Sequence, residues 1–273
     1  MRLTSFAALS CALAVAFFLA PCAPARASGG PVVVDVELML AVDVSRSMDE
    51  EEQRLQRRGY AEALRSTEFH DALKAGVHGA VALAYMEWAG SEHQTLIAPF
   101  TLIDGAPAAL AFADRLEAAP ISRESRTSIS RAIQEAVELF PGNGFRGLRR
   151  VIDVSGDGPN NAGPFVVAAR DAALAQGFVI NGLPIMLKRP TTSRWGEIEH
   201  LDVYYEDCVI GGPGALSIPL RDGADFATAT RRKLLMEISA PRDDARGIVP
   251  ASAEAPRIDC RIGEAMWRRM WDN

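Results

Sequence analysis

The chain has 273 residues, 48% of them hydrophobic, and a formal net charge of −6. This length accommodates one α/β domain of ordinary size with extensions at its ends. The acidic balance leaves no basic stripe for nucleic acid, so we predict no nucleic-acid partner.

The first 27 residues are typical of a secretory signal peptide. Arg2 supplies a positive start, residues 6–20 form an apolar segment, and Ala25-Arg-Ala27 offers a small-x-small cleavage site. The apolar segment is short for a membrane span. We therefore predict that residues 1–27 are removed, that the protein is periplasmic or secreted, and that the mature chain has no transmembrane span. Cys22 leaves a lipid-anchored form as the alternative.

Two cysteines, Cys208 and Cys260, remain after this cleavage. An even pair in an exported protein predicts a disulfide, and two separate thiols are the alternative. A bridge would attach the C-terminal part of the chain to the segment around Cys208.

Apolar segments predict a sheet that is mostly parallel. Residues 32–44 are nearly continuous in apolar side chains, as expected for a central strand that is covered on both faces. The short link 90–93 suits a hairpin, so the strand 94–103 is predicted to run antiparallel at one edge of the sheet. The remaining strands are expected at 77–88, 150–155, 178–185 and 215–220.

Helices alternate with these strands. Ser47 and Glu50 have the spacing of a capping box and predict a helix that continues to about Leu64. Further helices are expected at 107–116, 129–140, from Pro164 to Gly177 and after Asp222, and residues 186–210 are expected to be irregular. Alternating strands and helices are the signature of a doubly wound α/β structure with helices on both faces of the sheet.

We assign residues 28–239 to this domain and residues 240–273 to a C-terminal linker and short helix. The segment Ile262–Trp271 places its methionines and tryptophans on one apolar side of a helix. A helix docked on the domain is expected. A helix that binds a partner or a membrane surface is the alternative.

Oxygen-bearing side chains follow the predicted strands where those strands end. Asp43, Ser45 and Ser47 lie at the end of the first strand and just after it, Thr127 precedes a helix, and Asp157 follows the strand 150–155. In an open α/β sheet, the loops at the carboxyl ends of the strands gather in one crevice where ligands bind. Carboxylate and hydroxyl oxygens suit a hard cation, so Mg²⁺ is the predicted ion and Mn²⁺ the alternative.

The five residues, in the order D-x-S-x-S, distant Thr and distant Asp, resemble the metal-ion-dependent adhesion site (MIDAS) of the von Willebrand factor type A domain. The resemblance covers about residues 32–239 and implies a Rossmann-like fold of that type. It also implies that a bound ion captures an Asp or Glu side chain of a protein partner. Ser125 and Gly156 depart from the family, which often has Gly and Thr at those positions.

Three further stretches resemble a bacterial branch of exported type A proteins of uncharacterised function. They are Tyr85–Gly90, Asn181–Ile185 and Cys208–Gly214. This resemblance supports the predicted fold but does not identify the partner.

The chain lacks the common catalytic motifs, so we predict that it is not an enzyme. It has no G-x-S-x-G elbow, P-loop or H-E-x-x-H, and its four histidines are scattered. A Mg²⁺-dependent hydrolase or phosphatase that uses Asp43 as nucleophile or base is the alternative. A structural scaffold with a vestigial site is the third hypothesis.

Four further residues lie near the predicted crevice, and three of them have two interpretations. Asp153 lies inside an apolar strand and needs a partner there; a satisfied buried acid is expected, and support of the metal loops is the alternative. Glu87 and Trp88 either line the site or belong to the core. Arg46 is expected to be exposed, where it would favour an acidic partner.

Overall fold

The structure is a computed structural model that describes residues 30–187, 198–239 and 256–271. The predicted signal peptide therefore lies outside the described residues, as does most of the predicted linker. The strands are β1 (Val32–Asp43), β2 (Val81–Trp88), β3 (Gln94–Ile103), β4 (Phe145–Gly156) and β5 (Phe178–Pro184). The helices are α1 (Glu50–Arg65), α2 (Thr67–Ala75), α3 (Ala106–Ala118), α4 (Ile129–Leu139), α5 (Val166–Ala175), α6 (Leu201–Tyr204), α7 (Phe226–Ser239) and α8 (Ile262–Trp271).

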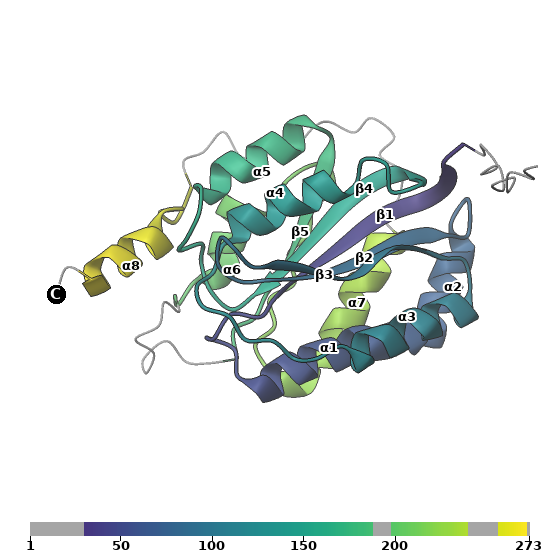
Figure 1. The fold of residues 1–273 in the computed structure, drawn as a ribbon, viewed down its shortest axis with the longest axis horizontal. Helices are drawn as coiled ribbons and strands as arrows, with labels where there is room; N and C mark the ends of the chain where they lie inside the picture. Colours follow the sequence, from purple (N-terminus) through teal and green to yellow (C-terminus); the bar gives the residue numbers. More distant parts are fainter. Residues whose placement is uncertain (1–29, 188–197, 240–255, 272–273) are drawn as a thin grey trace, which may run out of the picture. The chain divides into compact units, whose positions relative to one another are not determined.

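The strands form one five-stranded sheet in the order β3-β2-β1-β4-β5 (Figure 1). β1 is parallel to both of its neighbours, β2 and β4, and β4 is parallel to β5. β3 runs antiparallel to β2 at the edge, as predicted. The fold class, a doubly wound α/β sheet with one antiparallel edge strand, is confirmed.

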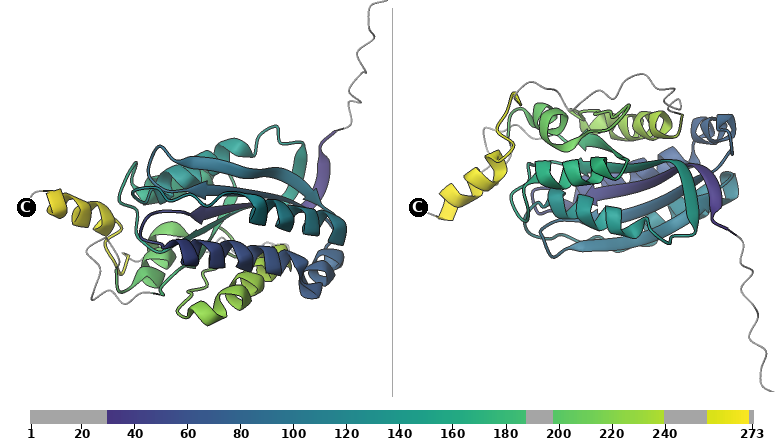
Figure 2. Two further views of the ribbon diagram at one scale, coloured as in Figure 1. Left: turned by 60° about the horizontal axis from the view of Figure 1, so that its bottom comes forward. Right: turned by 90° about the horizontal axis from the view of Figure 1, so that it is seen from above.

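Helices cover both faces of the sheet, as both views of Figure 2 show. Alternate residues of β1 point to opposite faces. Leu38 and Leu40 pack with side chains from α1, α2, α3 and α7. Met39 and Ala41 pack with side chains from α4, α5 and α6. β1 is consequently buried on both sides, which explains its continuous apolar sequence.

The start of α1 differs from the prediction. Its N-cap is Asp49, not Ser47: the Asp49 carboxylate accepts the Glu52 amide at 2.8 Å, and the Glu52 carboxylate accepts the Asp49 amide at 2.7 Å. The hydroxyl of Ser47 donates instead to Asp157, at 2.6 Å. Because that contact spans 110 residues of sequence, local spacing does not reveal it.

Other element boundaries also differ. A helix that the sequence did not predict, α2, precedes β2, which begins at Val81. β4 begins at Phe145 rather than at residue 150, and the part that the prediction omitted is only partly buried and contains polar side chains. Residues 215–220 do not form the predicted strand. Instead, Ser217 and Leu220 form isolated β-bridges to Gly182 of β5 and to Ile185, which follows β5. The segment expected to be irregular contains α6 and a π-helical turn, η2 (Tyr205–Val209).

The predicted disulfide between Cys208 and Cys260 is present. It joins η2 to the residues just before α8. None of the helices in the described part of the chain is long and apolar enough to cross a membrane.

Candidate metal centre

The loop after β1 folds back on its last residue. Asp43 is fully buried, and its Oδ1 accepts the amide of Ser45 at 2.7 Å. This turn brings the Ser45 and Ser47 hydroxyl oxygens to 2.8 Å from each other. The D-x-S-x-S spacing therefore gathers one carboxylate and two hydroxyls in a single tight turn.

Asp157 joins this turn from the neighbouring strand. β1 and β4 are parallel and adjacent, so the residues that follow them meet at one edge of the sheet. The Ser47 hydroxyl donates to Asp157 Oδ1 at 2.6 Å. Burial, and then the charge of Asp157, raise the pKa of Asp43 well above its ordinary value, although hydrogen bonds from Ser45 and Asp157 oppose this shift. Two acids thus share one buried site.

Thr127 lies in the loop before α4, next to Ser128, which caps that helix. The Thr127 amide donates to Asn161 Oδ1 at 2.9 Å, and the Asn161 amide donates to the Thr127 carbonyl at 2.8 Å. The same loop forms a bridge between Glu124 and Ser45. The Thr127 loop is therefore joined to both of the other loops through backbone and Asn161 contacts.

The chemistry of this cluster fits a divalent cation. Asp43 Oδ2 is buried and accepts no hydrogen bond, so it has an acceptor site for a cation. A divalent ion would balance the two carboxylates, and the neutral hydroxyls are oxygen donors that hard cations prefer. Among the described residues, no three His, Cys, Asp or Glu side chains are grouped to hold a metal. The cluster contains only two acids and relies on hydroxyls for its other oxygens.

Tyr205, in η2, is a residue at this site that sequence reasoning missed. A Cβ atom added to Gly156 would lie 2.8 Å from Asp43 Oδ2 and 3.0 Å from the Tyr205 hydroxyl. The phenol and the carboxylate therefore both border the space that a side chain at residue 156 would occupy. Burial, and then the charge of Asp43, raise the pKa of Tyr205. Gly156 lacks the side chain that often occurs in the family because Asp43 and Tyr205 occupy that space.

Of the four other residues near the predicted crevice, three are buried and one is exposed. Asp153 forms a buried ion pair with Lys233, which confirms a satisfied buried acid. Glu87 is buried and pairs with Arg57, while Trp88 is fully buried in the core. Arg46 is exposed, as expected.

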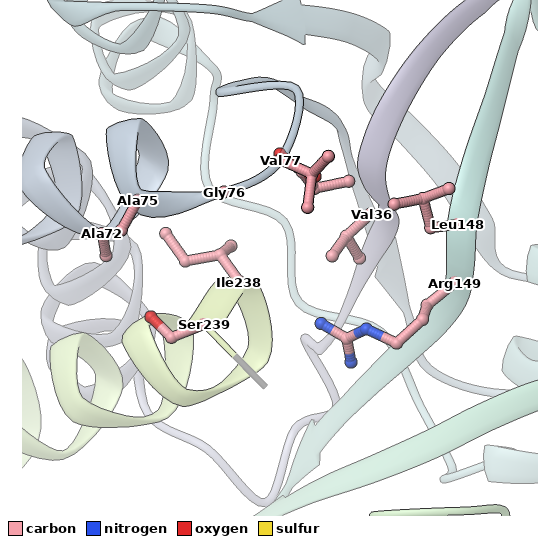
Figure 3. Close-up of a pocket in the computed structure, with 10 residues that line it drawn as sticks. Val36, Ala72, Ala75, Gly76, Val77, Leu148, Arg149, Ile238 and Ser239 are labelled. Carbon is pink, nitrogen blue, oxygen red and sulfur yellow. The ribbon is translucent and has the colours of Figure 1, made fainter. Parts of the chain in front are cut away.

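A separate cavity of about 220 Å³ lies at the other end of β1 (Figure 3). Its charged lining residues are Asp35 and Arg149. Asp35 accepts the backbone amides of His78 and Ala80, and Arg149 donates to the carbonyl of Glu237 at the end of α7. These contacts join chain segments of the fold, and the cavity contains no cluster of acids like the one at Asp43.

The sheet order, with one antiparallel edge strand and helices on both faces, is a von Willebrand factor type A-like fold. The chain belongs to the family described as "Protein of unknown function (DUF1194)", which matches residues 33–242. No curated protein matches the chain.

Solved structures share this fold at low sequence identity. Proximal thread matrix protein 1 from the mussel byssus, with a zinc-occupied MIDAS motif, is 12% identical with a TM-score of 0.56; the match covers 77% of this chain and 49% of that protein. The pilus adhesin SpaC from Lactobacillus rhamnosus GG is 11% identical with a TM-score of 0.56, over 77% of this chain and 32% of the adhesin. This chain matches less than half the length of each, and at these identities the likeness concerns the fold alone.

Proposed function

We propose that this protein is an exported binding domain that captures a protein partner through an Asp or Glu side chain of that partner. The capture depends on Mg²⁺, with Mn²⁺ as a substitute, held by Asp43, Ser45, Ser47, Thr127 and Asp157. The observation that carries the proposal is the hydrogen-bonded cluster in which Ser45 and Ser47 join Asp43 to Asp157 across two parallel strands.

The carboxylates and the hydroxyls of the cluster have different roles in such a site. Asp43 and Asp157 balance the charge of the ion, and the tight turn after Asp43 fixes the direction of both hydroxyls. Because the hydroxyls are neutral, a bound ion would remain electrophilic and attract a carboxylate from outside. Arg46 is exposed in the same turn and adds a positive charge for an acidic partner.

Two further findings support binding rather than catalysis. The structural neighbours are named for a thread matrix and for a pilus adhesin, not for a reaction. The cluster contains carboxylates and hydroxyls but none of the four histidines of the chain. A signal-like N-terminus supports export to the periplasm or the medium, where such partners occur.

Metal uptake by the mature protein is the first test. Calorimetry with MgCl₂ and MnCl₂ should detect binding by the wild type and none by Asp43→Asn. Asp35→Asn is the matched control, because Asp35 is a buried acid at the other end of the same strand and should not affect uptake. If the wild-type protein takes up neither ion, the proposal is wrong.

Partner capture is the second test. The mature protein, immobilised, is exposed to an envelope extract with Mg²⁺ and, in parallel, with EDTA. We expect a protein that is retained only with Mg²⁺, lost on Asp43→Asn and kept on Asp35→Asn. The same retained protein in EDTA and on Asp43→Asn would refute metal-dependent capture.

A further inference from the structure

The C-terminal strap, residues 256–271, is fixed to the domain at its beginning. Arg257 forms ion pairs with Glu206 and Asp207, each at 2.7 Å. Three residues later Cys260 is bonded to Cys208. The strap is therefore attached to η2, the same turn that carries Tyr205, and α8 begins two residues after Cys260.

The first turn of α8 contacts the loop that carries Asp157. Gly263 lies so close to the carbonyl oxygen of Asn160 that a Cβ at this position would overlap it. The Asn160 side-chain amide donates to Glu264 at 2.8 Å, and its Oδ1 accepts the Ser130 amide at 3.0 Å. Asn160 is fully buried, so the strap and α4 fix this loop from two sides.

The next turn of α8 contacts the loop that carries Thr127. The guanidinium of Arg126 lies over the Trp267 ring, 4.8 Å from its centroid. Arg126 has a φ of 72° and is the one non-glycine residue with positive φ in the described parts of the chain. Such a backbone costs conformational free energy and persists where its surroundings enforce it. The Arg126 Cβ lies near Gly90, and the amides of Thr127 and Ser128 are hydrogen-bonded to Asn161 and Ala89. The guanidinium of Arg126 is exposed and has the Trp267 ring as its aromatic contact.

We propose that Trp267 is a positioning residue for the candidate metal centre. By stacking on Arg126 it holds the left-handed backbone at that residue, which sets the direction in which Thr127 enters the site. α8 is thus part of the framework around the candidate metal centre. The proposal rests on the proposed function for the role of Thr127, but the backbone effect can be measured without any ion.

Hydrogen exchange of the metal-free protein, read by mass spectrometry, tests the backbone effect. Trp267→Ala should speed exchange in the peptide that covers residues 125–128 by about fivefold, while peptides from β1 and β4 remain unchanged. Trp267→Phe keeps an aromatic face and should restore slow exchange. Arg268→Ala, which removes an exposed cation from the same helix, is the control and should have no effect. Unchanged exchange at 125–128 in Trp267→Ala would overturn the proposal.

Manganese affinity tests the consequence for the site. Trp267→Ala should weaken Mn²⁺ binding about fivefold, and Trp267→Phe should bind within about twofold of wild type. Arg126→Gly adopts the left-handed backbone without strain, so adding Trp267→Ala to it should change the affinity little. An equal loss from Trp267→Ala in both backgrounds would refute positioning through Arg126. If the wild type takes up no Mn²⁺, the proposed function is wrong. The hydrogen-exchange result alone then decides whether Trp267 positions the Thr127 loop.

Discussion

The disulfide should contribute a large share of the stability of the oxidised protein. Cys208 and Cys260 are 52 residues apart, and the loop that they close contains α7. In the chain-entropy treatment, closing a loop of this length removes about 14 cal/mol/K from the unfolded state, or about 4 kcal/mol at 25 °C. Because α7 packs against α1 and α2 and its side chains enter the core, global unfolding must release this loop.

Urea unfolding, followed by circular dichroism, measures this contribution. Cys208→Ala combined with Cys260→Ala should lower the free energy of unfolding by about 4 kcal/mol, and a thiol-free reductant should have the same effect on the wild type. The reductant should leave the double variant unchanged, which is the control for non-specific effects. A loss below about 1 kcal/mol would show that the bridge hardly constrains the unfolded chain, and the entropy argument would be wrong.

Three further predictions concern buried charge. Lys233→Met should destabilise the protein by about 3–5 kcal/mol in urea unfolding, because it leaves Asp153 and Glu237 buried without their shared cation; a loss below about 1 kcal/mol would contradict this. Burial, and then the charge of Asp153, raise the pKa of Glu237 from 4.5 to about 7, so the folded state binds this proton more tightly and stability falls as pH rises from about 4.5 to 7. In EDTA, Glu237→Gln should remove this pH-dependent loss of stability, which amounts to at most about 3 kcal/mol. Parallel profiles of unfolding free energy against pH for the variant and the wild type would contradict the raised pKa. Asp43→Asn should raise the melting temperature of the metal-free protein by a few degrees, since it removes a buried charge beside Asp157; a lower melting temperature would contradict this reading of the site.

Much of the fold could be predicted because its central strands are buried on both faces. β1 is a nearly unbroken apolar segment, and the bounds of β3 agree with the prediction. Elements that lie partly in solvent were harder to place. The first half of β4 contains Arg146, Arg149 and Arg150 and is partly exposed, so its sequence does not differ from that of a loop. α2 has only Phe69 and Leu73 buried, too few for a clear helical stripe.

The site was predictable to the extent that its residues follow strand ends. Asp43 ends β1 and Asp157 directly follows β4, its parallel neighbour, so topology alone brings them together. Tyr205 lies in a π-helical turn, whose spacing has no common sequence signal, and it reaches the site through tertiary packing. Trp267 was predicted only as part of an apolar helix side. Its contact with Arg126 depends on where the disulfide anchors the strap.

Two of the buried acids, Asp153 and Asp43, differ in how their negative charge is compensated. Asp153, on β4, receives a cation from the chain itself, because Lys233 of α7 is buried beside it. Asp43, on β1, is equally buried, but the two largest influences on it, burial and the charge of Asp157, both disfavour its ionised form. A carboxylate that serves structure alone can be neutralised by a lysine, as Asp153 is. In the described part of the chain, Lys233 pairs with Asp153, whereas no lysine or arginine pairs with Asp43, which is the arrangement expected where the counter-charge comes from outside the chain.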